Sequence, residues 1–95
     1  MDDFFASPAF KPAEALVQLK RQLRELRPLA ERGNGFELRG QAVVELSADG
    51  QALQARLVKR PARSPEWTQH TLKNSADVRR FVDTVKAQLA RWSDE

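Results

Sequence analysis

The chain of 95 residues contains no cysteine, so disulfide bonds, thiolate metal sites and cysteine nucleophiles are excluded. It has a single histidine, which leaves no ligand spacing for zinc or another transition metal. No apolar run approaches the ~20 residues of a membrane span, and the pattern of a signal peptide is missing. These absences predict a soluble, cytoplasmic protein that binds no metal or cofactor and no membrane.

The charged residues that are present favour positive charge. The chain carries 16 basic and 13 acidic side chains, a formal net charge of +3, and four of the acids lie at its two ends. Most of the basic side chains are arginines, whose planar guanidinium suits bidentate contact with phosphate or carboxylate. This balance slightly favours a nucleic acid or an acidic protein as partner.

Residues 36–60 are interpreted as one β-hairpin. Apolar and polar residues alternate on both sides of Asp49-Gly50, a dipeptide that suits the positive φ values of a type I′ turn. A two-residue turn there places Leu46 opposite Leu53, so that apolar side chains meet across the strands. Its other face would present mixed side chains to water, among them Val43 and Val58.

Two amphipathic helices are predicted to flank the sheet. Leucines recur at 3-4-3 spacing over 12–27, between Pro12 at the start and Pro28 at the end, and 29–32 is expected to add one more turn. A second apolar stripe covers 75–92, with Asn74 or Ser75 as its N-cap. The predicted core combines both stripes with one face of the hairpin: Leu16, Leu19, Leu23, Leu26, Phe36, Leu38, Val44, Leu46, Leu53, Leu57, Val78, Phe81, Val85, Leu89 and Trp92.

A third strand is predicted over 66–73, where Thr and Trp are frequent. Thr68, His70 and Leu72 are expected to face inward, because Leu72 directly precedes the second helix; the opposite facing stays open. The predicted fold is therefore α+β, one domain of order α-β-β-β-α, with a three-stranded antiparallel meander and both helices on one face. Its bounds are 12–92, with a frayed end at 93–95.

Residues 1–11 are predicted to form an aromatic arm without regular structure. Exposed apolar side chains usually find cover, so the arm either packs on its own domain or inserts into a partner. The aromatic residues that would make this contact are Phe4, Phe5 and Phe10.

The element order over 12–92 resembles that of the double-stranded-RNA-binding domain. That family binds RNA through a long first hairpin loop and a lysine-rich start to its last helix. Here the hairpin turn is Ser47-Ala48-Asp49-Gly50, and the last helix begins Asn74-Ser75-Ala76-Asp77. The resemblance is one of element order and does not extend to the RNA-reading motifs.

The sequence predicts that the chain is not an enzyme. His70 has no recognisable triad or ligand set around it. Gly33-Asn34-Gly35 follows a helix and precedes a strand, the reverse of the order in a phosphate-binding loop. A small, bacterial-type binding module is the function that remains.

Two kinds of partner are considered. The preferred one is a protein, or a second copy of the chain, bound through the arm, through a sheet edge, or through Val43 and Val58. The alternative is a nucleic acid bound by stacking and phosphate contacts on a basic sheet face. The residues predicted to form that candidate face are Arg39, Arg56, Lys59, Arg60, Arg63, Trp67 and Lys73.

Overall fold

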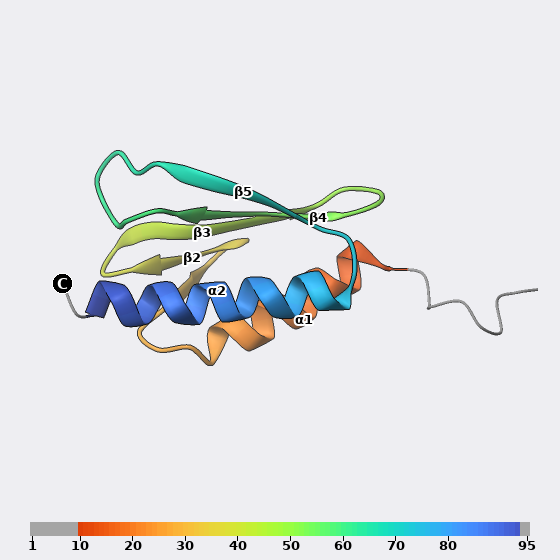
Figure 1. The fold of residues 1–95 in the computed structure, drawn as a ribbon, viewed down its shortest axis with the longest axis horizontal. Helices are drawn as coiled ribbons and strands as arrows, with labels where there is room; N and C mark the ends of the chain where they lie inside the picture. The colour runs from red at the N-terminus through yellow and green to blue at the C-terminus, as the bar shows by residue number, and fades with distance from the viewer. Residues whose placement is uncertain (1–9, 94–95) are drawn as a thin grey trace, which may run out of the picture.

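A computed structural model of the protein describes residues 10–93. Along the chain, five strands lie between an N-terminal and a C-terminal helix (Figure 1). The elements are α1 (Pro12–Arg24), β1 (Ala30–Arg32), β2 (Gly35–Leu38), β3 (Gln41–Ala48), β4 (Leu53–Val58), β5 (Trp67–Leu72) and α2 (Ser75–Ser93).

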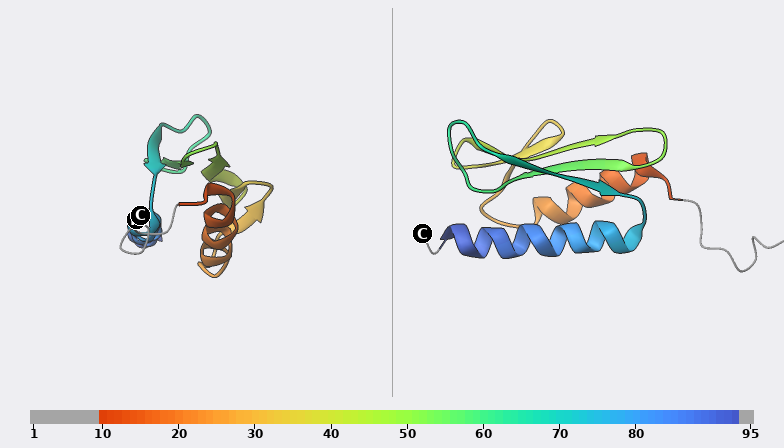
Figure 2. Two further views of the ribbon diagram at one scale, coloured as in Figure 1. Left: turned by 90° about the vertical axis from the view of Figure 1, so that its right-hand side faces the viewer. Right: turned by 45° about the horizontal axis from the view of Figure 1, so that its top comes forward.

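The strands form one antiparallel sheet in the order β1-β2-β3-β4-β5, in which each strand pairs with its neighbours in the chain. Both helices lie on the same side of the sheet, next to each other (Figure 2). The α+β class is confirmed, but the sheet has five strands and not the predicted three. Its element order also differs from that of the double-stranded-RNA-binding domain.

One of the missed turns lies at Arg39-Gly40, inside the predicted first strand. These residues have φ values of 55° and 83°, the positive values that a type I′ turn requires at both central positions. Leu38 therefore lies opposite Gln41, and the segment forms two strands, β2 and β3. The alternation of the sequence continues through the turn because Gly40 can also be read as a small residue on the buried face.

The other missed element is β1, which was predicted as a further helical turn. Helix α1 ends at its C-cap residue Glu25, whose N–H donates to the C=O of Gln22. Arg32 then pairs with Gly35 across the two-residue turn Gly33-Asn34. Gly33 has a φ of 60° at the first central position, the pattern of a type II′ turn. All residues of β1 are exposed, so the strand shows no alternation that a sequence pattern could detect.

The pairing of β3 with β4 differs from the predicted register by two residues. Leu46 lies opposite Ala55 and not Leu53, because the turn is longer than two residues. Oδ1 of Asp49 accepts hydrogen bonds from the N–H groups of Gln51 and Ala52, at 2.8 and 2.7 Å. A shift by two leaves paired side chains on the same face, so the predicted inward facing of Val44, Leu46, Leu53 and Leu57 is confirmed although the pairs are wrong.

The core lies between the sheet and the two helices. Of the predicted core residues, Leu16 and Leu26 are only partly buried, and the rest are buried.

Val43 and Val58, predicted to face water, are 0% and 1% exposed. Val43 is the extra residue of a β-bulge, since β2 pairs with the residues on either side of it, and a bulge redirects a side chain. Val58 lies opposite Trp67, which packs against the core. Buried in the folded monomer, the two valines offer no surface for dimerisation.

The junction of β5 and α2 follows the prediction. Oδ1 of Asn74 accepts a hydrogen bond from the N–H of Asp77 at 2.8 Å, so Asn74 is the N-cap. Leu72 is buried, and the ring of His70 contacts that of Phe81 edge-on at 5.3 Å. The predicted inward facing of β5 is thereby confirmed.

Within residues 10–93, no helix has the length and apolar character needed to cross a membrane.

Candidate functional site

The residues of the predicted basic face are spread over the molecule. Arg56 and Trp67 meet on the open face of the sheet, away from the helices. Lys59 and Arg63 belong to the loop after β4, whereas Lys73 lies at the opposite end of β5. The structure therefore brings part of the set together and separates the rest.

Arg56 and Trp67 are held by contacts within the sheet. The guanidinium carbon of Arg56 lies 4.5 Å from the ring centroid of Trp67, a cation–π geometry. Nη1 of Arg56 also donates to Oε1 of Glu45, its cross-strand neighbour, at 3.0 Å. A nucleic-acid base that stacked on this side of Trp67 would have to displace Arg56, which is already paired with a carboxylate.

The open face further along β4 and β5 is a closed hydrogen-bond network. Oε1 of Gln54 accepts from the amide of Gln69 at 2.9 Å and from the hydroxyl of Thr71 at 3.0 Å. Nε2 of Gln54 donates to Oδ2 of Asp49 at 3.1 Å. The backbone N–H of Gln51, together with Gln54, lowers the pKa of Asp49. The polar side chains of this part of the face hydrogen-bond to one another, so few of their groups are available to a ligand.

Of the three phenylalanines of the predicted arm, only Phe10 lies among the described residues. Phe10 is partly buried and packs against the core. Phe4 and Phe5 lie outside the described residues, so the choice between an intramolecular and an intermolecular role for them stays open.

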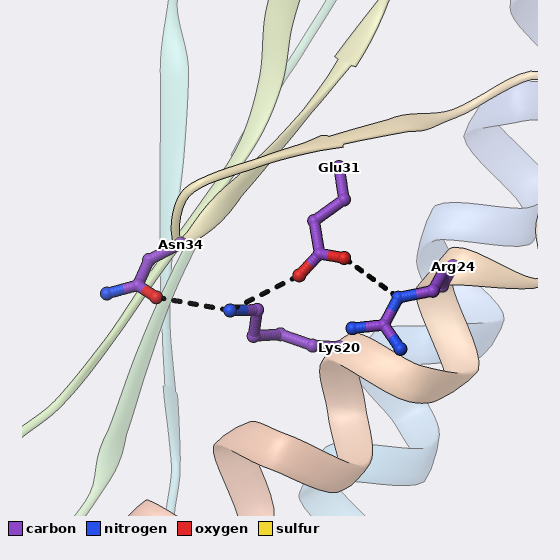
Figure 3. Close-up of polar contacts among 4 residues, drawn as sticks. All are labelled: Lys20, Arg24, Glu31 and Asn34. Atoms are coloured by element: carbon purple, nitrogen blue, oxygen red, sulfur yellow. Dashed lines mark hydrogen bonds and ion pairs between the residues drawn. The ribbon is translucent and has the colours of Figure 1, made fainter.

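The edge of the sheet at β1 is short and charged. Oε1 of Glu31 accepts from Nε of Arg24 at 2.8 Å, and Oε2 lies 3.2 Å from Nζ of Lys20 (Figure 3). Nζ of Lys20 also donates to Oδ1 of Asn34 at 3.3 Å. The hydrogen bond from Arg24 lowers the pKa of Glu31. These contacts tie β1 to α1, and a three-residue charged strand is a poor template for another strand.

The edge at β5 has none of these protections. This strand is six residues long, contains no charged residue and no proline, and pairs with β4 without a register shift. Threonine and tryptophan, which favour strands, make up half of it. In the part of the chain that the structure describes, no strand pairs with the outer side of β5.

Backbone groups of β5 point outward at every second residue. The N–H of Lys59 donates to the C=O of Glu66 at 2.8 Å, which extends the β4–β5 ladder by one pair. Hydrogen-bonded pairs alternate with non-bonded pairs in an antiparallel ladder, so the residues of β5 that bond to β4 are Thr68, His70 and Leu72. The residues whose N–H and C=O groups point away from β4 are Trp67, Gln69 and Thr71.

The sheet thus has one blunted edge and one open edge. Sequence reasoning anticipated an open edge but did not identify it. The uncharged run over 67–72 is the signal that could have done so, since natural edge strands usually carry charge, proline or a bulge.

The described part of the chain shows no group of three or more acidic or histidine side chains that could hold a metal ion. Comparisons with models of known protein families, with curated proteins and with solved structures found no match.

Proposed function

We propose that this chain is a protein-interaction module that associates with a second copy of itself through the outer edge of β5. The open, uncharged edge is the observation that carries the proposal. An exposed strand of this length offers a row of backbone donors and acceptors, and pairing with another strand satisfies all of them.

A two-fold axis sets the register of this pairing. In an isologous contact the same patch meets itself, so two β5 strands lie antiparallel. The register that uses every outward group places Gln69 opposite its own counterpart, and Trp67 opposite Thr71. One continuous antiparallel sheet would then extend across both copies, with all four helices on the same side.

The charges at the two ends of β5 favour a second copy over an unrelated strand. Glu66 precedes the strand and Lys73 follows it. Antiparallel pairing in the register above brings the Lys73 end of each copy next to the Glu66 end of the other. Both side chains are exposed, so the contact adds specificity of orientation more than affinity.

The test uses a substitution that changes only the outer side of the strand. Gln69→Pro removes an N–H that points away from β4, a position where edge strands tolerate proline. Gln69→Ala is the matched control, because it also loses the side-chain bond to Gln54 but keeps the N–H. Sedimentation velocity is measured on the full chain at about 10 μM and about 500 μM, since self-association depends on concentration.

We expect a dimer for the natural chain and for Gln69→Ala at the higher concentration, and a monomer for Gln69→Pro. Circular dichroism should show the same folded sheet content in all three proteins. A natural chain that sediments as a monomer at both concentrations contradicts the proposal, as does a Gln69→Pro variant that is folded and still dimeric.

Nucleic-acid binding is the alternative, and it is supported by the basic net charge and by Trp67. It requires a base to replace Arg56 on the Trp67 ring or to use the other face of that ring. A fluorescence titration with single- and double-stranded oligonucleotides at low salt tests it. Binding must weaken steeply as salt is added, because phosphate contacts release counterions.

A further inference from the structure

Strand β1 is held in place by backbone pairing and polar side-chain contacts. Its three residues, Ala30–Arg32, are all exposed, so no side chain of the strand belongs to the core. The strand pairs with β2 across a two-residue turn, and an isolated two-stranded hairpin is only marginally stable in water. Contacts between β1 and α1 therefore help to decide whether the strand stays paired.

These contacts converge on the carboxylate of Glu31 (Figure 3). Its two oxygens lie 2.8 Å from Nε of Arg24 and 3.2 Å from Nζ of Lys20. Nζ of Lys20 also donates to Oδ1 of Asn34, in the turn between β1 and β2. The side chains of Glu31 and Lys20 are 26% and 21% exposed, so solvent screens their attraction less than that of a fully exposed pair. We call the cluster of Lys20, Arg24 and Glu31 the ionic latch.

Strand β1 covers the outer edge of β2. The C=O of Asn34 accepts a hydrogen bond from the N–H of Leu46 in β3 at 2.8 Å. Backbone groups alternate in direction along a strand, so the even-numbered residues of β2 bond to β3, and Gly35 and Glu37 bond to β1. If β1 left its place, the N–H and C=O groups of these two residues would be exposed, and the sheet would have an open edge on each side.

A chain with two open edges associates differently from a chain with one. Pairing of β5 with β5 is isologous and closes at a dimer. Pairing of β5 in one copy with β2 in another is heterologous, and it leaves one free edge of each kind, so that further copies can add. Within residues 10–93, β1 is the strand that covers β2 and prevents this second kind of contact.

We propose that β1 is a guard strand, held on α1 by the ionic latch, that confines self-association to the edge at β5. When the latch opens, β1 leaves the edge of β2 and β5 of another copy takes its place. β5 suits this position because it is uncharged and six residues long, whereas β1 has three residues. Opening of the latch is independent of β5 pairing, but the replacement of β1 by β5 rests on the proposed function.

Amide hydrogen exchange measures the opening of the guard strand. The N–H of Glu37 bonds to β1 and that of Phe36 bonds to β3, so two neighbouring residues report on the two sides of β2. Exchange is followed by NMR on the full chain. Glu31→Gln removes the charge of the latch and should speed the exchange of the Glu37 amide about fivefold, in line with the loss of an exposed ionic contact. The exchange of the Phe36 amide should not change.

Glu45→Gln is the matched control. Glu45 forms an ion pair with Arg56 at 3.0 Å on the open face of the sheet, so this substitution removes the same charge from a pair outside the latch. It should leave the exchange of Glu37 unchanged. Arg24→Gln should speed this exchange as Glu31→Gln does, and the double variant should add little, because both substitutions remove one shared contact. Circular dichroism verifies that every variant is folded.

Sedimentation velocity at about 500 μM tests the assembly step, since association depends on concentration. We expect species larger than a dimer for Glu31→Gln and a dimer for Glu45→Gln. Adding Gln69→Pro to Glu31→Gln should abolish the larger species, because β5 can then no longer pair.

The proposal is overturned if the Glu37 amide exchanges no faster in Glu31→Gln and Arg24→Gln, or if Glu45→Gln accelerates it equally. It is also overturned if Glu31→Gln opens the strand and forms nothing larger than a dimer. A natural chain that stays monomeric contradicts the proposed function and the assembly step, whereas faster exchange of Glu37 in the latch variants would still establish the guard strand.

Discussion

Replacing Arg39 by asparagine should stabilise the protein. Arg39 occupies the first central position of the β2–β3 turn at a φ of 55°. The left-handed conformation costs an ordinary L-residue roughly 1–2 kcal/mol, and asparagine tolerates it much better. The Arg39 side chain is exposed and has no hydrogen bond or ion pair with the described residues, so little is lost in exchange.

The free energy of unfolding should therefore rise by about 1 kcal/mol, the lower limit of the cost of this conformation. For a domain of this size, such a gain raises the melting temperature by about 4–8 °C. Thermal and urea unfolding of the full chain, followed by circular dichroism, measure it. The urea slope should stay constant, because the surface exposed on unfolding does not change.

Two controls keep the interpretation specific. Arg63→Asn removes a positive charge at the same end of the molecule from a loop residue with no positive φ, and should change the melting temperature little. Gly40→Ala should lower stability by about 1 kcal/mol, since Gly40 has a φ of 83°. An Arg39→Asn protein that melts at or below the temperature of the natural chain would refute the reasoning, and equal stabilisation by Arg63→Asn would attribute the gain to charge alone.

Two further predictions concern the other end of the molecule and the β1 edge. Asn74→Ala should cost about 1 kcal/mol of unfolding free energy by removing the N-cap of α2, whereas Ser75→Ala should be nearly neutral; thermal melts that rank the two in the opposite order would contradict the cap assignment. The hydrogen bond from Arg24 lowers the pKa of Glu31 in the folded state. As the pH falls, the unfolded chain therefore takes up the proton first, and stability is lost in the acidic range below about pH 4. Glu31→Gln should flatten the fall in melting temperature between neutral and acidic pH, and the remaining slope should include Asp49, whose pKa is also lowered; an unchanged slope would show that the pair adds nothing to stability.

The two helices and the facing of the strands could be predicted because each rests on a local period. The leucine stripe of α1 and the cap of α2 are complete within their own segments. The register of β3 against β4 was wrong by two, yet the inward facing of Val44, Leu46, Leu53 and Leu57 was right because strand side chains alternate with a period of two. Periodicity specifies which side of a strand is buried, and turn length specifies its partner.

The missed strands had no local signal of their own. The usual dipeptides of a type I′ turn are Asn-Gly and Asp-Gly, and Arg39-Gly40 departs from them at the residue that carries the strain. The hollow of about 240 Å³ beside Trp92, which Arg39 and Arg60 also line, could not be predicted either. Trp92 was assigned to the core stripe, which is correct because its side chain is buried. Only the fold brings Trp92 beside Arg39 and Arg60, which are far away in the sequence.

The two ends of the molecule differ in how well they obey local rules. At the end that holds the β3–β4 turn, Asp49 satisfies two backbone N–H groups, and near it Asn74 caps the helix. At the opposite end Arg39 lies at a position where asparagine would be less strained, and the buried Nε1 of Trp92 has no hydrogen-bond partner among residues 10–93. Natural proteins concentrate such departures at functional sites, where stability is exchanged for binding.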